Sequence, residues 1–124
     1  MSPNPKTTVP TRRLWRQGDI YIQEFPSLPE GCSRMKGGVI ARGEATGHAH
    51  RLSSTRGAKL YLAAQPKPNE RPIKPGLIYL EVSVPECAIE HQEHASIRLT
   101  TGVYEIWRQR EFDATHGGFR MSAD

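Results

Sequence analysis

Short apolar runs that end in glycine or proline are the feature that most restricts the fold of this chain. The most apolar run is Leu77–Val84, which Pro85 follows, and several other runs alternate apolar and polar residues with the period of two that strands have. No stretch sustains the periodicity of a helix. The predicted strands are Asp19–Phe25, Val39–Arg42, His48–Leu52, Ala58–Ala63, Leu77–Val84, Cys87–His91, Ser96–Leu99 and Val103–Phe112.

Turn-forming residues divide these predicted strands. We expect Pro85 to end the strand before it, and Glu30–Ser33 and Thr100–Gly102 to form turns. The chain has 11 glycines and 10 prolines, and only 36% of its residues are hydrophobic, which is typical of short strands joined by many turns. The fold class expected from this pattern is all-β, as a small single-domain barrel or sandwich.

The length of 124 residues suffices for one domain and is too short for two. Proline-rich residues 1–13 have little to bury and are predicted to be a mobile leader. Residues 14–113 are predicted to form the β domain, and residues 114–124 a flexible tail.

Cysteine usage and hydropathy predict a cytoplasmic protein. Cys32 and Cys87 have no C-x-x-C spacing, and two reduced thiols are favoured over a disulfide. No apolar run approaches the roughly 20 residues that cross a bilayer, and the amino terminus lacks the apolar core of a signal peptide. The net charge of +4 is dispersed, so it is compatible with a polyanionic partner without requiring one.

Four of the five histidines form two close pairs, His48 with His50 and His91 with His94. On a strand, His48 and His50 would share one face, with α-carbons roughly 6.5 to 7 Å apart. His91 and His94 would both point inward from a tight turn, but a strand would direct them to opposite faces. We expect the fold to unite the pairs around a divalent transition metal such as Zn, Fe, Mn or Ni, with His48, His50 and His94 as the first candidates.

Charged residues near the histidines supply the candidate catalytic groups. They are Glu44 and Glu93, which flank the two pairs, and Arg110 in the last predicted strand. The expected activity is that of a small metalloenzyme, a hydrolase or oxygenase acting on a small-molecule substrate. Homo-oligomer formation is left open.

Two further functions stay open. Two histidines can act as general base and acid in a metal-independent endoribonuclease or in a related RNA-binding protein, with arginines neutralising the phosphate. His94-Ala95-Ser96 has the H-x-S form of two-histidine phosphoesterases, but no second copy accompanies it. Strand aromatics such as Trp107 would suit base stacking, although core packing is their commoner role. The third function is that of a structural accessory module whose histidines stabilise the barrel.

Three motifs in order resemble a small family of uncharacterised bacterial and phage-associated proteins. They are G-E-x-T-G-H-x-H at Gly43–His50, H-x-E-H-x-x-I-x-L-x-x-G-x-Y at His91–Tyr104 and Q-R-E at Gln109–Glu111, and Arg16–Asp19 opens the matching region. The resemblance implies that these residues belong together, and it implies no reaction.

The H-x-H pair is also similar to that of the cupin superfamily, in which such a pair and a later histidine hold a metal inside a small β-barrel. Only His48 and His50 correspond to that pattern. The cupin glutamate is missing, because Arg51–Gly57 contains no carboxylate. The similarity implies a cupin-like architecture.

Overall fold

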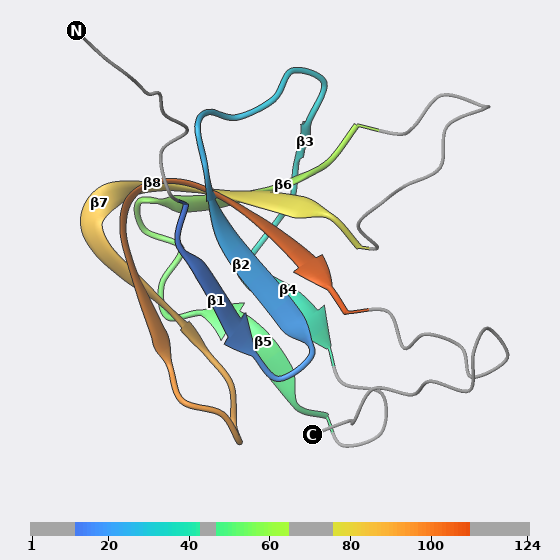
Figure 1. Ribbon diagram of the computed structural model, residues 1–124, viewed down its shortest axis with the longest axis vertical. Helices are drawn as coiled ribbons and strands as arrows, with labels where there is room; N and C mark the ends of the chain where they lie inside the picture. The colour runs from blue at the N-terminus through green and yellow to red at the C-terminus, as the bar shows by residue number, and fades with distance from the viewer. Residues whose placement is uncertain (1–11, 43–46, 65–75, 110–124) are drawn as a thin grey trace, which may run out of the picture.

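The computed structural model describes residues 12–42, 47–64 and 76–109, and within these ranges the chain forms eight β-strands and no helix (Figure 1). The predicted all-β class is therefore confirmed. The strands are β1 (Leu14–Gln17), β2 (Ile20–Phe25), β3 (Ser33–Arg34), β4 (Val39–Arg42), β5 (Ala49–Leu52), β6 (Ala58–Leu62), β7 (Ile78–Glu90) and β8 (Ile97–Arg108).

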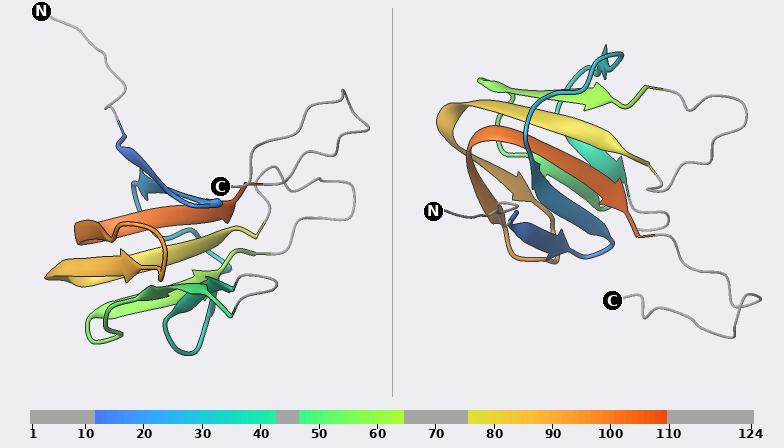
Figure 2. Two further views of the ribbon diagram at one scale, coloured as in Figure 1. Left: turned by 90° about the horizontal axis from the view of Figure 1, so that it is seen from below. Right: turned by 45° about the horizontal axis from the view of Figure 1, so that its top comes forward.

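The strands form one antiparallel sheet that curls into a half-barrel (Figure 2). Its main order is β1-β2-β8-β7-β5-β4, with β6 joining β7 to β3. The long strand β7 pairs with β8 along one side, whereas its other side pairs first with β6 and then with β5. The curl therefore comes from two long central strands with shorter strands around them.

The concave face of this sheet holds the apolar core. In β2, Ile20 and Ile22 are buried, and Ile22 pairs with the buried Ile106 of β8. Every second side chain along β2 therefore points into the core. The largest fully buried apolar side chains are Ile20, Ile22, Leu60, Leu80, Ile89, Leu99, Ile106 and Val82.

Pro85 does not end a strand, so that prediction is wrong. β7 continues through Pro85 as far as Glu90. The pairing of β7 with β8 shifts register between Val82 and Glu86. A proline within this irregularity removes no regular ladder hydrogen bond, because the residues there are not paired in register.

One predicted turn and the last residue of another are also part of strands, while Glu30 and Gly31 form a turn as predicted. Thr100–Gly102 lies within β8, where Gly102 pairs with Val82 and adopts a φ of 152° that favours glycine. Ser33, predicted in a turn, belongs to β3. Both errors arose because glycine and small polar residues are turn formers locally, while pairing with a neighbouring strand decides their conformation in the sheet.

Other predictions concern the cysteines and the ends of the chain. Cys32 and Cys87 are free thiols, as expected, and Cys87 is buried in the core. The predicted leader and tail lie outside the described residues, apart from Arg12 and Arg13. In the part of the chain that the structure describes, no helix is long and apolar enough to cross a membrane.

Candidate functional site

Four histidines from two distant segments lie together beside the polar end of the core. His50 belongs to β5 and His48 precedes this strand, whereas His91 and His94 lie in the bend between β7 and β8. The ring centroid of His91 is 4.4 Å from that of His50, 4.6 Å from that of His94 and 5.6 Å from that of His48. The expected union of the two pairs is therefore present, with His91 at its centre.

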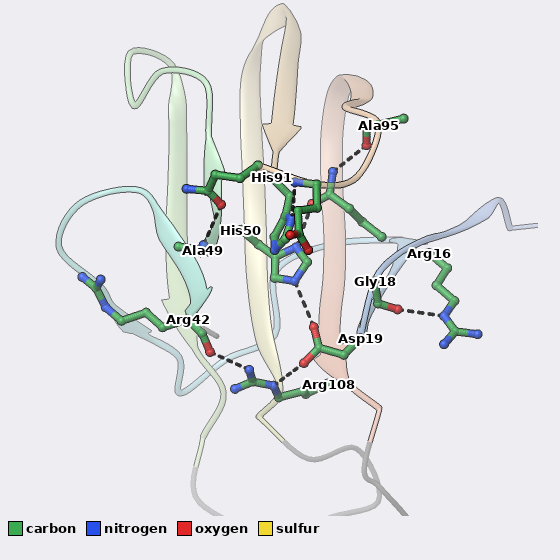
Figure 3. A network of polar contacts seen from close by, with 12 residues as sticks. Arg16, Gly18, Asp19, Arg42, Ala49, His50, His91, Ala95 and Arg108 are labelled. Atoms are coloured by element: carbon green, nitrogen blue, oxygen red, sulfur yellow. Dashed lines mark hydrogen bonds and ion pairs between the residues drawn. The ribbon is translucent and has the colours of Figure 1, made fainter. Parts of the chain in front are cut away.

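Both ring nitrogens of His50 are engaged by protein atoms. Nδ1 lies 2.8 Å from Oε1 of Gln17, and Nε2 lies 2.9 Å from Oδ1 of Asp19 (Figure 3). The side chain of His50 is buried, with 3% of its surface exposed. His50 is thus held by the polypeptide on both sides of its ring.

Gln17 determines which nitrogen of His50 carries a proton. Its amide nitrogen donates hydrogen bonds to the carbonyl oxygens of Ile89, at 2.9 Å, and Ala95, at 2.8 Å. These bonds use both N–H donors, so the amide oxygen faces His50 and accepts a hydrogen bond from Nδ1–H. Because Ile89 and Ala95 flank the bend that carries His91 and His94, Gln17 also holds that bend against β5.

Asp19 extends the network to two more strands. Its Oδ2 accepts a hydrogen bond of 2.8 Å from Nε of Arg108 in β8, and Arg108 donates another of 2.7 Å to the carbonyl oxygen of Arg42 in β4 (Figure 3). The backbone oxygen of Asp19 accepts from the amide of Gln109 at 2.7 Å. The turn between β1 and β2 is therefore joined to β4, β5 and β8 by polar contacts.

Burial and hydrogen bonding oppose each other at Asp19 and His50. At Asp19, burial alone would raise the pKa, but hydrogen bonds from Arg108 and His50 lower it below its ordinary value of 3.8. Burial lowers the pKa of His50 below 6.5, the bond to Asp19 opposes this, and the nearby His91 adds to the lowering. Gln17 and Asp19 each present an acceptor oxygen to the ring of His50. Their hydrogen bonds favour the charged imidazolium, whereas the lowered pKa favours the neutral ring. The hydrogen bonds fix the orientation of the ring, and burial makes its proton leave more readily.

The backbone of the bend holds the ring of His91. Its Nδ1 accepts a hydrogen bond of 3.0 Å from the backbone amide of Glu93. Burial lowers its pKa below 6.5, and the neighbouring His94 and His48 lower it further. Both effects on the pKa favour the uncharged imidazole, which is the form that binds metal ions.

Glu93 and His94 complete the cluster. The Oε2 atom of Glu93 lies 3.6 Å from Nδ1 of His48. A β-carbon added to Gly18 would lie 2.7 Å from Nε2 of His94 and 3.4 Å from Cε1 of His50, so glycine lets these rings approach the backbone. A hollow of about 210 Å³ opens beside His91, lined by Ala49, Arg51, Glu90, His91 and Gln92.

The predicted site residues differ in where they lie. His48, His50, His91, His94 and Glu93 are brought together, whereas Glu44 and Arg110 lie outside the described residues. Sequence reasoning did not select Gln17 or Asp19 as site residues. The available signal was their place in Arg16–Asp19, a polar stretch between two apolar runs.

A family model described as "Domain of unknown function (DUF8820)" matches residues 16–109. The chain belongs to this family. The matched DUF8820 region contains every residue of the polar network, from Gln17 and Asp19 to Arg108, and all four clustered histidines. This agrees with the predicted membership of an uncharacterised family. No curated protein and no solved structure matches the chain.

Proposed function

We propose that this DUF8820 domain binds a divalent transition metal through His48, His91 and His94. The observation that carries the proposal is the spacing of the three rings, with His91 centred 5.6 Å from His48 and 4.6 Å from His94. Imidazoles bind Zn²⁺ at about 2.0–2.1 Å, so the centroids of two rings on one tetrahedral ion lie roughly 5 Å apart. The observed spacings lie on either side of that value.

The rings must turn to bind a metal. In the described residues, no three His, Cys, Asp or Glu side chains already surround a single point as ligands. The hydrogen bond from Glu93 to Nδ1 of His91 must also break, since a neutral ring that accepts there carries its proton on Nε2. Losing that bond costs about 1 kcal/mol, which is small beside the 10–16 kcal/mol measured for structural zinc in small domains.

His50 acts as a support in this proposal and not as a ligand. Both of its nitrogens already have partners in Gln17 and Asp19, and breaking either contact would leave a buried polar group unsatisfied. The ligand set is therefore reduced from the four histidines of the sequence prediction to three. The H-x-H pair then has one ligand and one supporting ring, unlike the cupin arrangement.

The reaction that fits this site best is metal-assisted hydrolysis of a small substrate. A metal held by the three histidines would supply an activated water at neutral pH. Glu93, whose carboxylate lies beside His48, would act as the general base, and the hollow beside His91 would take the small molecule. Pockets that bind drug-sized ligands are larger, at about 300–1,000 Å³.

Elemental analysis of tag-free protein tests the proposal. We expect about one transition-metal ion per chain after incubation with Zn²⁺, Mn²⁺, Fe²⁺ or Ni²⁺ and gel filtration. His91→Ala and His94→Ala should lose the metal, whereas His116→Ala, at a histidine outside the described residues, should retain it. Circular dichroism would show that the variants remain folded. No metal in the parent protein after incubation, or equal retention in all variants, would overturn the metal site.

A further inference from the structure

The sheet face opposite to the core carries two pairs of aromatic rings, each with an arginine over it. In the first, the rings of Tyr21 and Trp107 are stacked with centroids 5.4 Å apart, and Cζ of Arg16 lies 5.5 Å from the centroid of Tyr21. Tyr21 alternates with the buried Ile20 and Ile22 along β2, so it points away from the core.

The second pair repeats this arrangement four residues along β2. The rings of Phe25 and Tyr79 have centroids 5.3 Å apart, and Cζ of Arg12 lies 5.5 Å from the centroid of Phe25. Tyr79 is buried, with 7% of its surface exposed, so Phe25 and Arg12 are the accessible groups of this pair and Tyr79 supports Phe25 from beneath. We call these two rows the arginine–aromatic face, defined by Arg12, Arg16, Tyr21, Phe25, Tyr79 and Trp107. It lies across β1, β2, β8 and β7, which are neighbours in the sheet (Figure 1).

Strand pairing accounts for the repeat. Tyr21 pairs with Arg16 on one side and with Trp107 on the other. A separation of four residues along a strand corresponds to roughly 13 Å between the two rows. Arg12 precedes β1 and Arg16 lies on it, and the alternate residue between them, Leu14, is 54% exposed. Two exposed arginines and an exposed leucine at this edge of the sheet present charge and apolar surface together.

We propose that the arginine–aromatic face binds single-stranded RNA. Unstacked bases stack on aromatic rings and on guanidinium planes, and sheet surfaces with such rings stack two or three bases in known modules. Arginines also neutralise the phosphates. Within the described residues, Arg16 donates from Nε to the carbonyl oxygen of Gly18 at 2.8 Å, which is one of five donors on the guanidinium.

Gln23 lies between the two aromatic pairs on this face. Its amide group can both donate a hydrogen bond to a ribose 2′-hydroxyl and accept one from it, so this position favours RNA over DNA. Glu105 pairs with Gln23 on the same face but is buried, with 3% exposed, so its carboxylate lies below the surface that a phosphate would approach. A duplex would not suit this face, because its bases are stacked inside the helix and cannot reach the rings.

RNA binding here is separate from the proposed metal site. The histidines lie beside the polar end of the concave face, whereas Tyr21 and Phe25 lie on the opposite face of β2. Binding measurements in the presence of EDTA therefore test the RNA proposal whether or not the protein binds a metal.

Fluorescence anisotropy with a labelled single-stranded RNA of mixed sequence, in EDTA and at several salt concentrations, provides the test. The test variant is Arg12→Ala/Arg16→Ala, and the matched control is Arg56→Ala/Arg98→Ala, which removes the same charge from two other exposed arginines. Loss of two phosphate contacts should weaken binding about 25-fold at 0.1 M salt and reduce the salt slope by about 1.4. The control should change affinity less than about threefold.

Three results would overturn the proposal. They are no binding of the parent protein at low salt, equal weakening in both double variants, and affinity for single-stranded DNA or duplex RNA that matches that for single-stranded RNA. Equal weakening would mean that overall charge, and not this face, attracts the polyanion.

Discussion

The Nε2 atom of His50 lies 2.9 Å from Oδ1 of Asp19, although 31 positions separate the two residues in the chain. The same carboxylate accepts from Nε of Arg108, 89 positions from Asp19. One carboxylate thus holds three parts of the half-barrel in register next to the histidine cluster. Four predictions follow from this relationship and from the groups around it.

Asp19→Ala should lower the free energy of unfolding by about 2 kcal/mol, because it removes charge-assisted hydrogen bonds to His50 and Arg108. Urea denaturation measures the change. Glu24→Ala is the matched control. Glu24 pairs with Arg13 at the surface, where an ion pair contributes about 1 kcal/mol or less to stability. Equal losses of unfolding free energy in the two variants would show that the Asp19 hydrogen bonds contribute no more than a surface ion pair.

Gln17→Leu should cost about 3 kcal/mol or more, because it leaves the carbonyl oxygens of Ile89 and Ala95 and the Nδ1 atom of His50 without their partner. Amide hydrogen exchange in residues 91–95 should accelerate, since Gln17 holds this bend in place. Gln23→Leu, on the half-buried opposite face of the sheet, should change stability by only about 0.5 kcal/mol. A stable Gln17→Leu protein with unchanged exchange would contradict the role assigned to Gln17.

Gly18→Ala should weaken metal binding, because its β-carbon would lie 2.7 Å from Nε2 of His94 and displace that ring. Gly37→Ala is the control. Gly37 has a φ of 74° and Gly18 a φ of 59°, but a β-carbon at Gly37 would meet nothing within 4 Å. Both variants should lose about 1–2 kcal/mol of stability from the backbone conformation. Only Gly18→Ala should bind Zn²⁺ more weakly in calorimetric titration, and equal affinities would exclude contact between Gly18 and the metal site.

The metal-free protein should lose stability on acidification. The pKa values of His50 and His91 are lowered below 6.5 by burial, so the unfolded chain binds protons that the folded protein resists. The free energy of unfolding therefore falls as the pH drops through 6.5 toward the folded pKa values, by at most about 1.4 kcal/mol per pH unit for each histidine. Asp19, whose pKa is lowered below 3.8, adds a further loss at more acidic pH.

Urea denaturation in EDTA at intervals between about pH 8 and pH 5 measures this dependence. His91→Asn should show a shallower slope than the parent protein, because one of the two groups is removed. A free energy of unfolding that stays constant or rises on acidification would contradict the assigned directions of the pKa shifts.

Much of the sheet could be predicted because strands have a local signature. Alternation identified β2, and an apolar run identified the first half of β7. The continuity of β7 through Pro85 could not be predicted, since it depends on where the register with β8 shifts. His48 was predicted to share a strand with His50 but lies before β5, and its approach to His91 comes from the path of the chain instead.

The site was predictable in its histidines and not in its supporting residues. The two close pairs are visible in the sequence, because spacing is a local property. Gln17 could not be chosen, because its importance comes from carbonyl groups 72 and 78 positions away. A glutamine becomes decisive only when burial removes water as an alternative partner.

The sequence by itself thus determined the all-β class and the two close histidine pairs, since these follow from side-chain chemistry and from periodicity over a few residues. Only the tertiary structure decided that His91 lies at the centre of the histidine cluster, that both ring nitrogens of His50 have protein partners, and that Asp19 and Gln17 hold the cluster. It also decided that two arginines lie over aromatic rings on the opposite face. The physical reason is that hydrogen-bond partners, burial and strand register depend on contacts between distant parts of the chain. These contacts contribute free energy only once the sheet has formed and excluded water.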